Sequence, residues 1–162
     1  MKKVIYPGSF DPITNGHLDI IKRASHIFDG VIIAVGNNTA KTTLFSVDER
    51  IALIKKCTET LPNVEIKQYS NLTVDFVKES GTNLIIRGTR DSQDYNFENR
   101  IANLNRLLDS DVETLLMLAD KKYELVSSSM VKEVLSFGGD ISQFVPQPVE
   151  IKLKEKFNNE KN

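Results

Sequence analysis

Val4-Ile5-Tyr6, the turn Pro7-Gly8-Ser9-Phe10-Asp11-Pro12 and the segment Thr14-Asn15-Gly16-His17 together decide the fold of this chain. The apolar, β-branched start is typical of a strand, and the segment after the turn begins a helix. Backbone N–H groups and the positive end of the helix dipole converge at a helix N-terminus. A histidine aimed at the same point completes a phosphate-binding arrangement, so the stretch predicts nucleotide chemistry.

Short β-branched runs alternate with helical patterns along most of the chain. Strands are predicted at Val4–Tyr6, Val31–Val35, Val64–Gln68, Leu84–Ile86 and Thr114–Leu118. Helices are predicted at Gly16–Phe28, Val47–Thr60, Thr73–Ser80, Tyr95–Leu108, Ser128–Phe137 and Val149–Phe157. The alternation predicts an α/β fold, a doubly wound five-stranded parallel sheet with extra C-terminal helices.

Length and charge limit the classes of function. The 162 residues, of which 40% are hydrophobic, predict a single domain over residues 1–162, with residues 158–162 as a frayed polar tail. The chain has 21 basic and 22 acidic side chains, so we expect no broad nucleic-acid-binding face, and phosphate recognition must be local. The apolar runs are too short to cross a membrane, and the first residues lead into a strand rather than a signal peptide. We therefore expect a cytoplasmic enzyme with neither a membrane nor a nucleic-acid partner.

Four polar loops follow the predicted strands. Ligands of doubly wound sheets bind at the carboxyl ends of the strands, where the strand order reverses. The loops are Ser9–His17 after the first strand, Asn37–Leu44 after the second, Arg87–Arg90 after the fourth and Tyr123–Ser129 after the fifth. They supply the His17 imidazole, the cations Lys41, Arg87 and Arg90, and two helix N-termini. This set suits a polyphosphate ligand.

Some polar residues also have a purely structural interpretation. Arg90 could pair with Asp91 or Asp94 instead of binding a ligand, and the serines before the fifth helix are typical helix caps. We interpret His26 as structural, because it lies near a helix C-terminus, and Cys57 as a small buried hydrophobe. The sequence contains no P-loop, no dinucleotide-binding glycine motif and no Cys/His metal cluster.

Several motifs resemble one enzyme family. Gly8–His17 is similar to the Thr/His-x-Gly-His signature of the nucleotidylyltransferase superfamily, whose fold is Rossmann-like. Ile86–Arg90, Asp94–Glu98 and Val126–Ser129 are similar to the phosphopantetheine adenylyltransferases within it, and the resemblance extends to Pro146. It implies adenylyl transfer from ATP, with Mg²⁺, to 4′-phosphopantetheine, giving dephospho-coenzyme A and pyrophosphate. It also implies a homohexamer and feedback inhibition by coenzyme A.

The resemblance implies roles for individual residues as well. His17 would stabilise the transition state, and Lys41 and Arg90 would be further catalytic residues. Phosphopantetheine would be held by Ser9, Lys41, Arg87 and Thr73, where Thr73 replaces a usually larger apolar residue. The ATP site would comprise Ser9, Phe10, His17, Gly88, Thr89, Arg90, Glu98, Tyr123, Glu124, Leu125, Val126, Ser127, Ser128 and Ser129.

The implied reaction fits a site that lacks an obvious base. A phosphate monoester has a second pKa of about 6, so the attacking group is already largely dianionic at neutral pH. Positioning and charge neutralisation then suffice for direct in-line displacement. Two alternatives remain: another nucleotidylyltransferase acting on nicotinamide mononucleotide or glycerol phosphate, and a non-catalytic module that senses adenylates.

Overall fold

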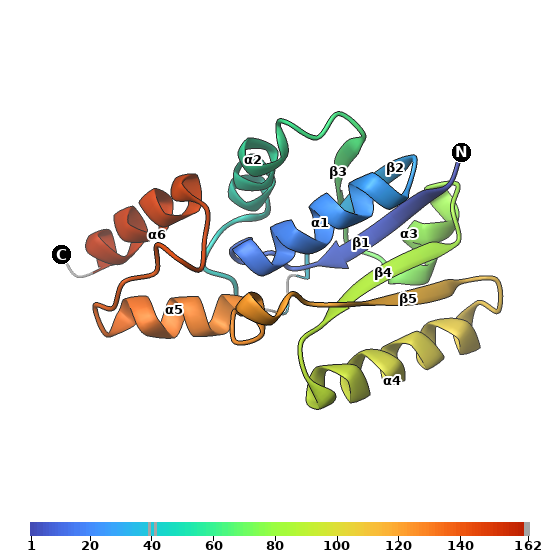
Figure 1. The fold of residues 1–162 in the computed structure, drawn as a ribbon. Helices are drawn as coiled ribbons and strands as arrows, with labels where there is room; N and C mark the ends of the chain where they lie inside the picture. Colours follow the sequence, from blue (N-terminus) through green and yellow to red (C-terminus); the bar gives the residue numbers. More distant parts are fainter. Residues whose placement is uncertain (39, 41, 161–162) are drawn as a thin grey trace.

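The structure, a computed structural model, describes residues 1–38, 40 and 42–160, and its centre is a parallel sheet with helices on both faces (Figure 1). The strands are β1 (Lys3–Gly8), β2 (Gly30–Gly36), β3 (Val64–Tyr69), β4 (Leu84–Thr89) and β5 (Glu113–Leu118). They form one five-stranded sheet in the order β3-β2-β1-β4-β5, and every neighbouring pair is parallel. The doubly wound α/β prediction is therefore confirmed.

Side chains cap the N-termini of several helices. The helices are α1 (Asn15–Ile27), α2 (Val47–Thr58), α3 (Thr73–Glu79), α4 (Ser92–Leu108), the 3₁₀ turn η1 (Lys121–Tyr123), α5 (Ser128–Ser136) and α6 (Gln147–Glu160). Helix α4 starts at Ser92 rather than at the predicted Tyr95, because the Asp91 side chain caps it by accepting the Asp94 N–H. Helix α6 contains Pro148 in its first turn, where proline is tolerated, and it includes residues 158–160, which were expected in a frayed tail.

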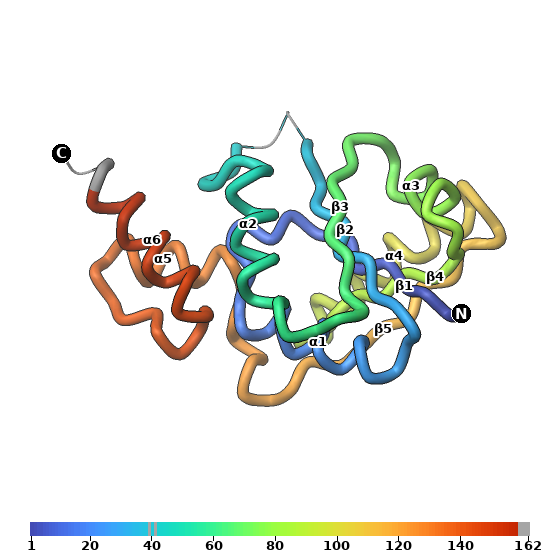
Figure 2. Tube along the Cα trace, turned by 90° about the horizontal axis from the view of Figure 1, so that it is seen from above, coloured from blue at the N-terminus to red at the C-terminus, as the bar shows by residue number. Residues whose placement is uncertain are grey.

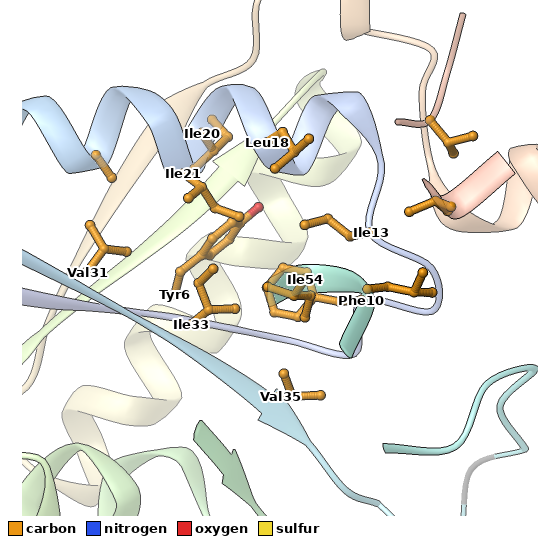
Figure 3. Packing of buried hydrophobic residues seen from close by; sticks show 14 of the residues in the cluster. Tyr6, Phe10, Ile13, Leu18, Ile20, Ile21, Val31, Ile33, Val35 and Ile54 are labelled. Carbon is orange, nitrogen blue, oxygen red and sulfur yellow. The ribbon is translucent and has the colours of Figure 1, made fainter. Parts of the chain in front are cut away.

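Each face of the sheet carries its own apolar layer, because successive strand residues point to opposite faces. One layer packs α1 and α2 against the sheet and continues into α5 and α6. It includes Val4, Tyr6, Val31, Ile33 and Val35 from the strands with Ile20, Ile21 and Ile54 from the helices (Figure 3). The other layer packs Ile5, Ile32 and Ile85 against Val74 and Val77 of α3. Helix α4 contacts β4, β5 and α3. Helices α5 and α6 lie next to one another on the α2 side of the molecule (Figure 2).

Cys57 and His26, which we interpret as structural, lie away from the predicted ligand site. Cys57 on α2 is partly buried against the first layer, and burial raises the pKa of its thiol to about 11. His26 is exposed near the end of α1, where Nδ1 lies 2.7 Å from the Lys22 carbonyl oxygen. Neither residue lies at the carboxyl ends of the strands.

The strand order identifies where a ligand can bind. The chain passes from β1 outward to β2 and β3, then crosses to the other side of β1 to form β4 and β5. The order therefore reverses between β1 and β4. In open α/β sheets, the crevice beyond the carboxyl ends of two such strands is the usual ligand site.

Candidate active site

A cleft of about 250 Å³ opens at the reversal point between β1 and β4. Its walls come from the ends of these strands, the first turns of α1 and α5, α4 and the segment between β5 and α5. The predicted site residues that line it are Ser9, Phe10, His17, Arg87, Gly88, Arg90, Glu98, Tyr123, Val126, Ser127 and Ser128. Three of the four predicted loops thus meet in one cavity, together with α4. The fourth, Asn37–Leu44, contributes none of its described residues to the lining.

Other predicted site residues do not line this cleft. Glu124, Leu125 and Ser129 are exposed outside it. Thr89 is buried at the end of β4, and the Thr73 hydroxyl lies 3.2 Å from that of Tyr69, away from the cleft. Lys41 lies outside the described residues.

His17 is held by a reciprocal pair of hydrogen bonds at the start of α1. The His17 N–H donates to Thr14 Oγ1 at 3.3 Å, and the Thr14 N–H donates to His17 Nδ1 at 3.1 Å. This is a capping box in which histidine takes the place of the usual glutamate. Since Nδ1 accepts a hydrogen bond, the neutral ring carries its proton on Nε2. Nε2–H bonds no other residue that the structure describes, so it is available to a ligand in the cleft.

The electrostatic surroundings keep the His17 ring neutral. Burial, followed by the nearby positive charges of Arg87 and Arg90, lowers the pKa of His17 to about 4. In the free protein at pH 7 the ring is therefore a neutral donor. The cationic groups at this site are the arginines.

Arg87 reaches into the cleft from β4 and is fixed by Glu98 of α4. Its Nε and Nη2 donate to the two Glu98 carboxylate oxygens, each at 2.7 Å, and its Nη1 donates to the Pro7 carbonyl oxygen. Burial works to lower the pKa of Arg87, but the Glu98 carboxylate holds it above its ordinary value. The resemblance assigns Glu98 to ATP. In the structure Glu98 lines the cleft, and both of its carboxylate oxygens accept hydrogen bonds from Arg87, so it also orients that guanidinium group.

Arg90 is oriented in the same way by Asp94. Nε donates to Asp94 Oδ2 at 2.7 Å, Nη2 donates to Oδ1 at 3.1 Å, and Nη1 donates to the Val126 carbonyl oxygen at 3.3 Å. Of the two partners that the sequence left open, Asp94 is therefore the one used. Asp91 caps α4 instead. Sequence reasoning did not include Asp94 in the site, although its i,i+4 spacing from Arg90 was a signal for it.

Three charged side chains that do not line the cleft connect the loop after β1 to other parts of the chain. The Asp11 carboxylate accepts the backbone N–H groups of Leu44 and Phe45, both at 2.9 Å, and the Lys132 ammonium at 3.2 Å. These bonds join the loop after β1 to the loop after β2 and to α5. Arg50 adds to the first connection, because its Nη1 donates to the carbonyl oxygens of Ser9 and Gly36 at 2.7 and 2.9 Å.

Arg50 and Lys132 were not identified from the sequence. Each lies on a helix far along the chain from the loop that it holds. Spacing within a helix gives no sign of such a long-range contact.

The second helix start is joined directly to the first loop. Ser127 caps α5 by accepting the Met130 N–H at 3.1 Å, and Ser128 Oγ donates to the Pro12 carbonyl oxygen at 2.7 Å. The cleft therefore combines a neutral imidazole donor, two oriented guanidinium groups and the N-termini of α1 and α5. These groups suit the binding of several phosphates at once.

Two kinds of feature are absent from the described residues. No group of three or more His, Cys, Asp or Glu side chains among them could hold a metal ion. In the same part of the chain, no helix is long and apolar enough to cross a membrane.

Comparison with known proteins relates this site to a family. Residues 5–134 match the family model described as cytidylyltransferase-like. The chain is 50% identical to a phosphopantetheine adenylyltransferase of Staphylococcus carnosus over 155 residues, which are 96% of each protein. It is 48% identical to one of Prochlorococcus marinus, with 96% of this chain and 99% of the relative covered. A third, of Leuconostoc mesenteroides, is 50% identical over 99% of both.

A solved structure gives independent support for the fold. The putative nicotinate-nucleotide adenylyltransferase of Vibrio parahaemolyticus superposes with a TM-score of 0.70, covering 97% of this chain and 95% of that one. Its sequence is 20% identical. At this level of identity the likeness establishes a common fold and carries no information on substrate.

The surroundings of His17 predict an unusual titration. We expect its ring to titrate near pH 4 instead of near 6.5, the value of an unperturbed imidazole, because burial and two arginines disfavour the imidazolium. NMR titration of the ring protons measures this, with the His17→Ala spectrum assigning the signal. Since the folded pKa lies below the unfolded one, this group leaves the free energy of unfolding unchanged above about pH 6.5 and lowers it progressively towards pH 4. A midpoint at about pH 6 or higher would contradict the described surroundings.

Proposed function

The chain belongs to the phosphopantetheine adenylyltransferase family, and we propose that it transfers the adenylyl group of ATP to 4′-phosphopantetheine, giving dephospho-coenzyme A and pyrophosphate. This reaction is a step of coenzyme A biosynthesis. The observation that carries the proposal is the convergence of His17, Arg87 and Arg90 on one cleft at the reversal point of the sheet. Convergent phosphate-binding groups suit a reaction whose two substrates both carry phosphates.

The proposed reaction is a direct in-line displacement. A phosphate oxygen of 4′-phosphopantetheine attacks the α-phosphorus of ATP, a new P–O bond forms, and the bond from that phosphorus to the bridging oxygen of pyrophosphate breaks. The attacking phosphate is largely dianionic at neutral pH, so no side chain needs to remove a proton. No covalent intermediate with the protein forms.

The oriented groups of the cleft take complementary parts in this step. His17 Nε2–H and Arg90 would stabilise the charge that develops on the ATP phosphates, and Arg87 would hold the phosphate of 4′-phosphopantetheine. We retain Lys41 as a catalytic residue and as a further cation for the phosphate of 4′-phosphopantetheine, on the resemblance alone. Because Glu98 and Asp94 already fix the two arginines, little reorganisation is needed when the substrates bind.

Magnesium enters this proposal with ATP. The cleft carboxylates Asp94 and Glu98 are both bonded to arginines, and no metal-binding cluster occurs among the described residues. The donor set therefore does not fit a magnesium ion held by the protein. A Mg²⁺ ion chelated by the ATP phosphates needs no such ligands.

We also propose that the enzyme assembles as a homohexamer. Large apolar side chains remain exposed along α4 and the edge strand β5, among them Leu104, Leu107, Leu108 and Leu118. Leu107 and Leu118 are 85% and 74% exposed. Exposed apolar surface beside an unpaired strand edge favours association between copies of a chain.

Coenzyme A inhibition and a cytoplasmic location follow from the proposed chemistry. Coenzyme A contains the product of this reaction and differs from it by one phosphate, so it would compete for the same cleft. We place the enzyme in the cytoplasm, where ATP is available.

The proposed function predicts a specific dependence on His17. Wild-type protein should release pyrophosphate from ATP only when 4′-phosphopantetheine is present, and His17→Ala should lower kcat by about 10²–10³ with smaller changes in KM. His26→Ala is the matched control, because His26 lies outside the cleft, and it should retain wild-type rates. A coupled pyrophosphate assay gives both results.

Other outcomes of that assay would overturn the assignment. Turnover with nicotinamide mononucleotide, or with CTP and glycerol phosphate, in place of 4′-phosphopantetheine would indicate a different transferase. ATP binding without any turnover would indicate a sensing module.

The Arg87–Glu98 pair predicts which substrate each residue serves. Arg87→Ala should weaken binding of 4′-phosphopantetheine more than that of ATP, and Glu98→Gln should do the same to a smaller extent, because it acts through Arg87. Asp94→Asn, the matched change beside Arg90, should affect ATP more. Calorimetric titration with each substrate measures this. A Glu98→Gln loss confined to ATP would show that Glu98 contacts ATP directly.

The proposed assembly predicts a defined change in mass. Wild-type protein should have the mass of a hexamer in light scattering coupled to size-exclusion chromatography, and Leu107→Glu should form smaller species, because it places a charge on the exposed apolar face. Lys55→Glu, on the exposed surface of α2, serves as the control for an added acidic residue. A monomeric wild-type protein would contradict the proposal.

A further inference from the structure

Tyr6 lies at the base of the cleft and has no part in the functions described so far. It belongs to the central strand β1, and only 5% of its surface is exposed. Its ring packs edge-on against Phe10, with 5.3 Å between centroids, and lies 6.4 Å from the His17 ring. The ring extends from the strand toward α1 (Figure 3).

The Tyr6 hydroxyl lies close to Gly88 of the neighbouring strand β4. A Cβ atom placed on Gly88, at the end of β4, would lie 3.8 Å from the hydroxyl oxygen and 3.3 Å from Cγ1 of Ile20. Both Tyr6 and Gly88 line the cleft. The hydroxyl is therefore at the cleft floor, between β4 and the first helix.

This hydroxyl forms no hydrogen bond with any residue in the described part of the chain, although its side chain is almost fully buried. The hydroxyl oxygen is not one of the fully enclosed polar atoms that lack a partner, so it opens into the cleft that Tyr6 lines. A ligand that fills the cleft displaces water from such a group and must supply a hydrogen bond in its place. An unpaired hydroxyl at the floor of a ligand cleft points to a partner supplied by the ligand.

The surroundings indicate the chemistry of that partner. Burial, only partly offset by Arg87, raises the pKa of Tyr6 to about 12, so the group stays protonated and can donate. The neutral His17 ring and the guanidinium groups of Arg87 and Arg90 face the same space. Each guanidinium is paired with a carboxylate but uses only three of its N–H groups within the protein, so both keep donors for a ligand. A ligand that matches these donors carries several acceptor oxygens, and a phosphate meets this description.

We propose that the Tyr6 hydroxyl donates a hydrogen bond to a phosphate oxygen of bound ATP, beside the Nε2–H of His17. Tyr6 is then a substrate-contacting residue for the reaction, supplied by the strand itself, whereas His17 comes from α1. This inference rests on the proposed function for the identity of the phosphate. The hydroxyl acts as a neutral donor, so it stabilises the phosphate without adding charge to the cleft.

The test compares Tyr6→Phe with Tyr95→Phe. Both changes remove one hydroxyl, but Tyr95 is half exposed on α4 and lies outside the cleft. A hydrogen bond to a charged group is worth enough to predict a fall in kcat/KM of about 10- to 100-fold for Tyr6→Phe in the pyrophosphate assay. Tyr95→Phe should keep the wild-type value. In the absence of ligand, Tyr6→Phe should have the wild-type Tm or a higher one, because the hydroxyl that it removes has no partner among the described residues.

Two results would overturn the proposal. One is a kcat/KM for Tyr6→Phe within about twofold of wild type, less than the loss of any such bond. The other is a Tm for ligand-free Tyr6→Phe that is lower than wild type, which would show that the hydroxyl bonds within the protein.

Calorimetric titration with ATP separates this proposal from the proposed function. If wild-type protein binds ATP but releases no pyrophosphate, the adenylyl-transfer assignment fails. The Tyr6 contact is still tested, since Tyr6→Phe should then bind ATP about 10-fold or more weakly than both wild type and Tyr95→Phe. Equal ATP affinity for all three proteins, in the absence of turnover, would overturn it.

Discussion

The hydrogen bond from the Thr14 backbone N–H to His17 Nδ1 is the constraint on which the site depends. It satisfies a donor that the start of α1 would otherwise leave unpaired, and it fixes the proton of the neutral ring on Nε2. One contact therefore stabilises the helix and orients the group that faces the cleft. A glutamate at the same position would complete the capping box equally well, but it would bring a negative charge to a site built for phosphates.

The rest of the cleft is organised around that donor by pairs of charges. Glu98 and Asp94 hold Arg87 and Arg90 in bidentate geometry, so the cations keep their positions before a substrate arrives. Asp11 performs a similar task for the backbone, because its carboxylate joins the loops after β1 and β2. Donors that are already oriented need little rearrangement when charge develops on a phosphate, which is the main source of rate enhancement in a reaction without a general base.

The sequence predicts the sheet and the position of the cleft, since β-branched runs, helical spacing and the strand-reversal rule depend on local patterns. His17, Arg87 and Arg90 follow from the same reasoning. Helices α4 and α6 begin before the predicted residues. Asp91 caps α4, and Pro148 is tolerated in the first turn of α6. The pairing of Glu98 with Arg87, the loop contacts of Asp11 and the unpaired Tyr6 hydroxyl could not be predicted, because each depends on three-dimensional packing between elements far apart in the chain.

A crystal structure of the protein with a non-hydrolysable ATP analogue tests the central claim most directly. The neutral Nε2–H of His17 should lie about 2.7–3.1 Å from an oxygen of the bound phosphates, while Nδ1 keeps its bond to the Thr14 N–H. The guanidinium groups of Arg87 and Arg90 should border the same cleft. A nucleotide bound elsewhere, or a His17 ring turned so that Nδ1 faces the phosphates, would contradict the account.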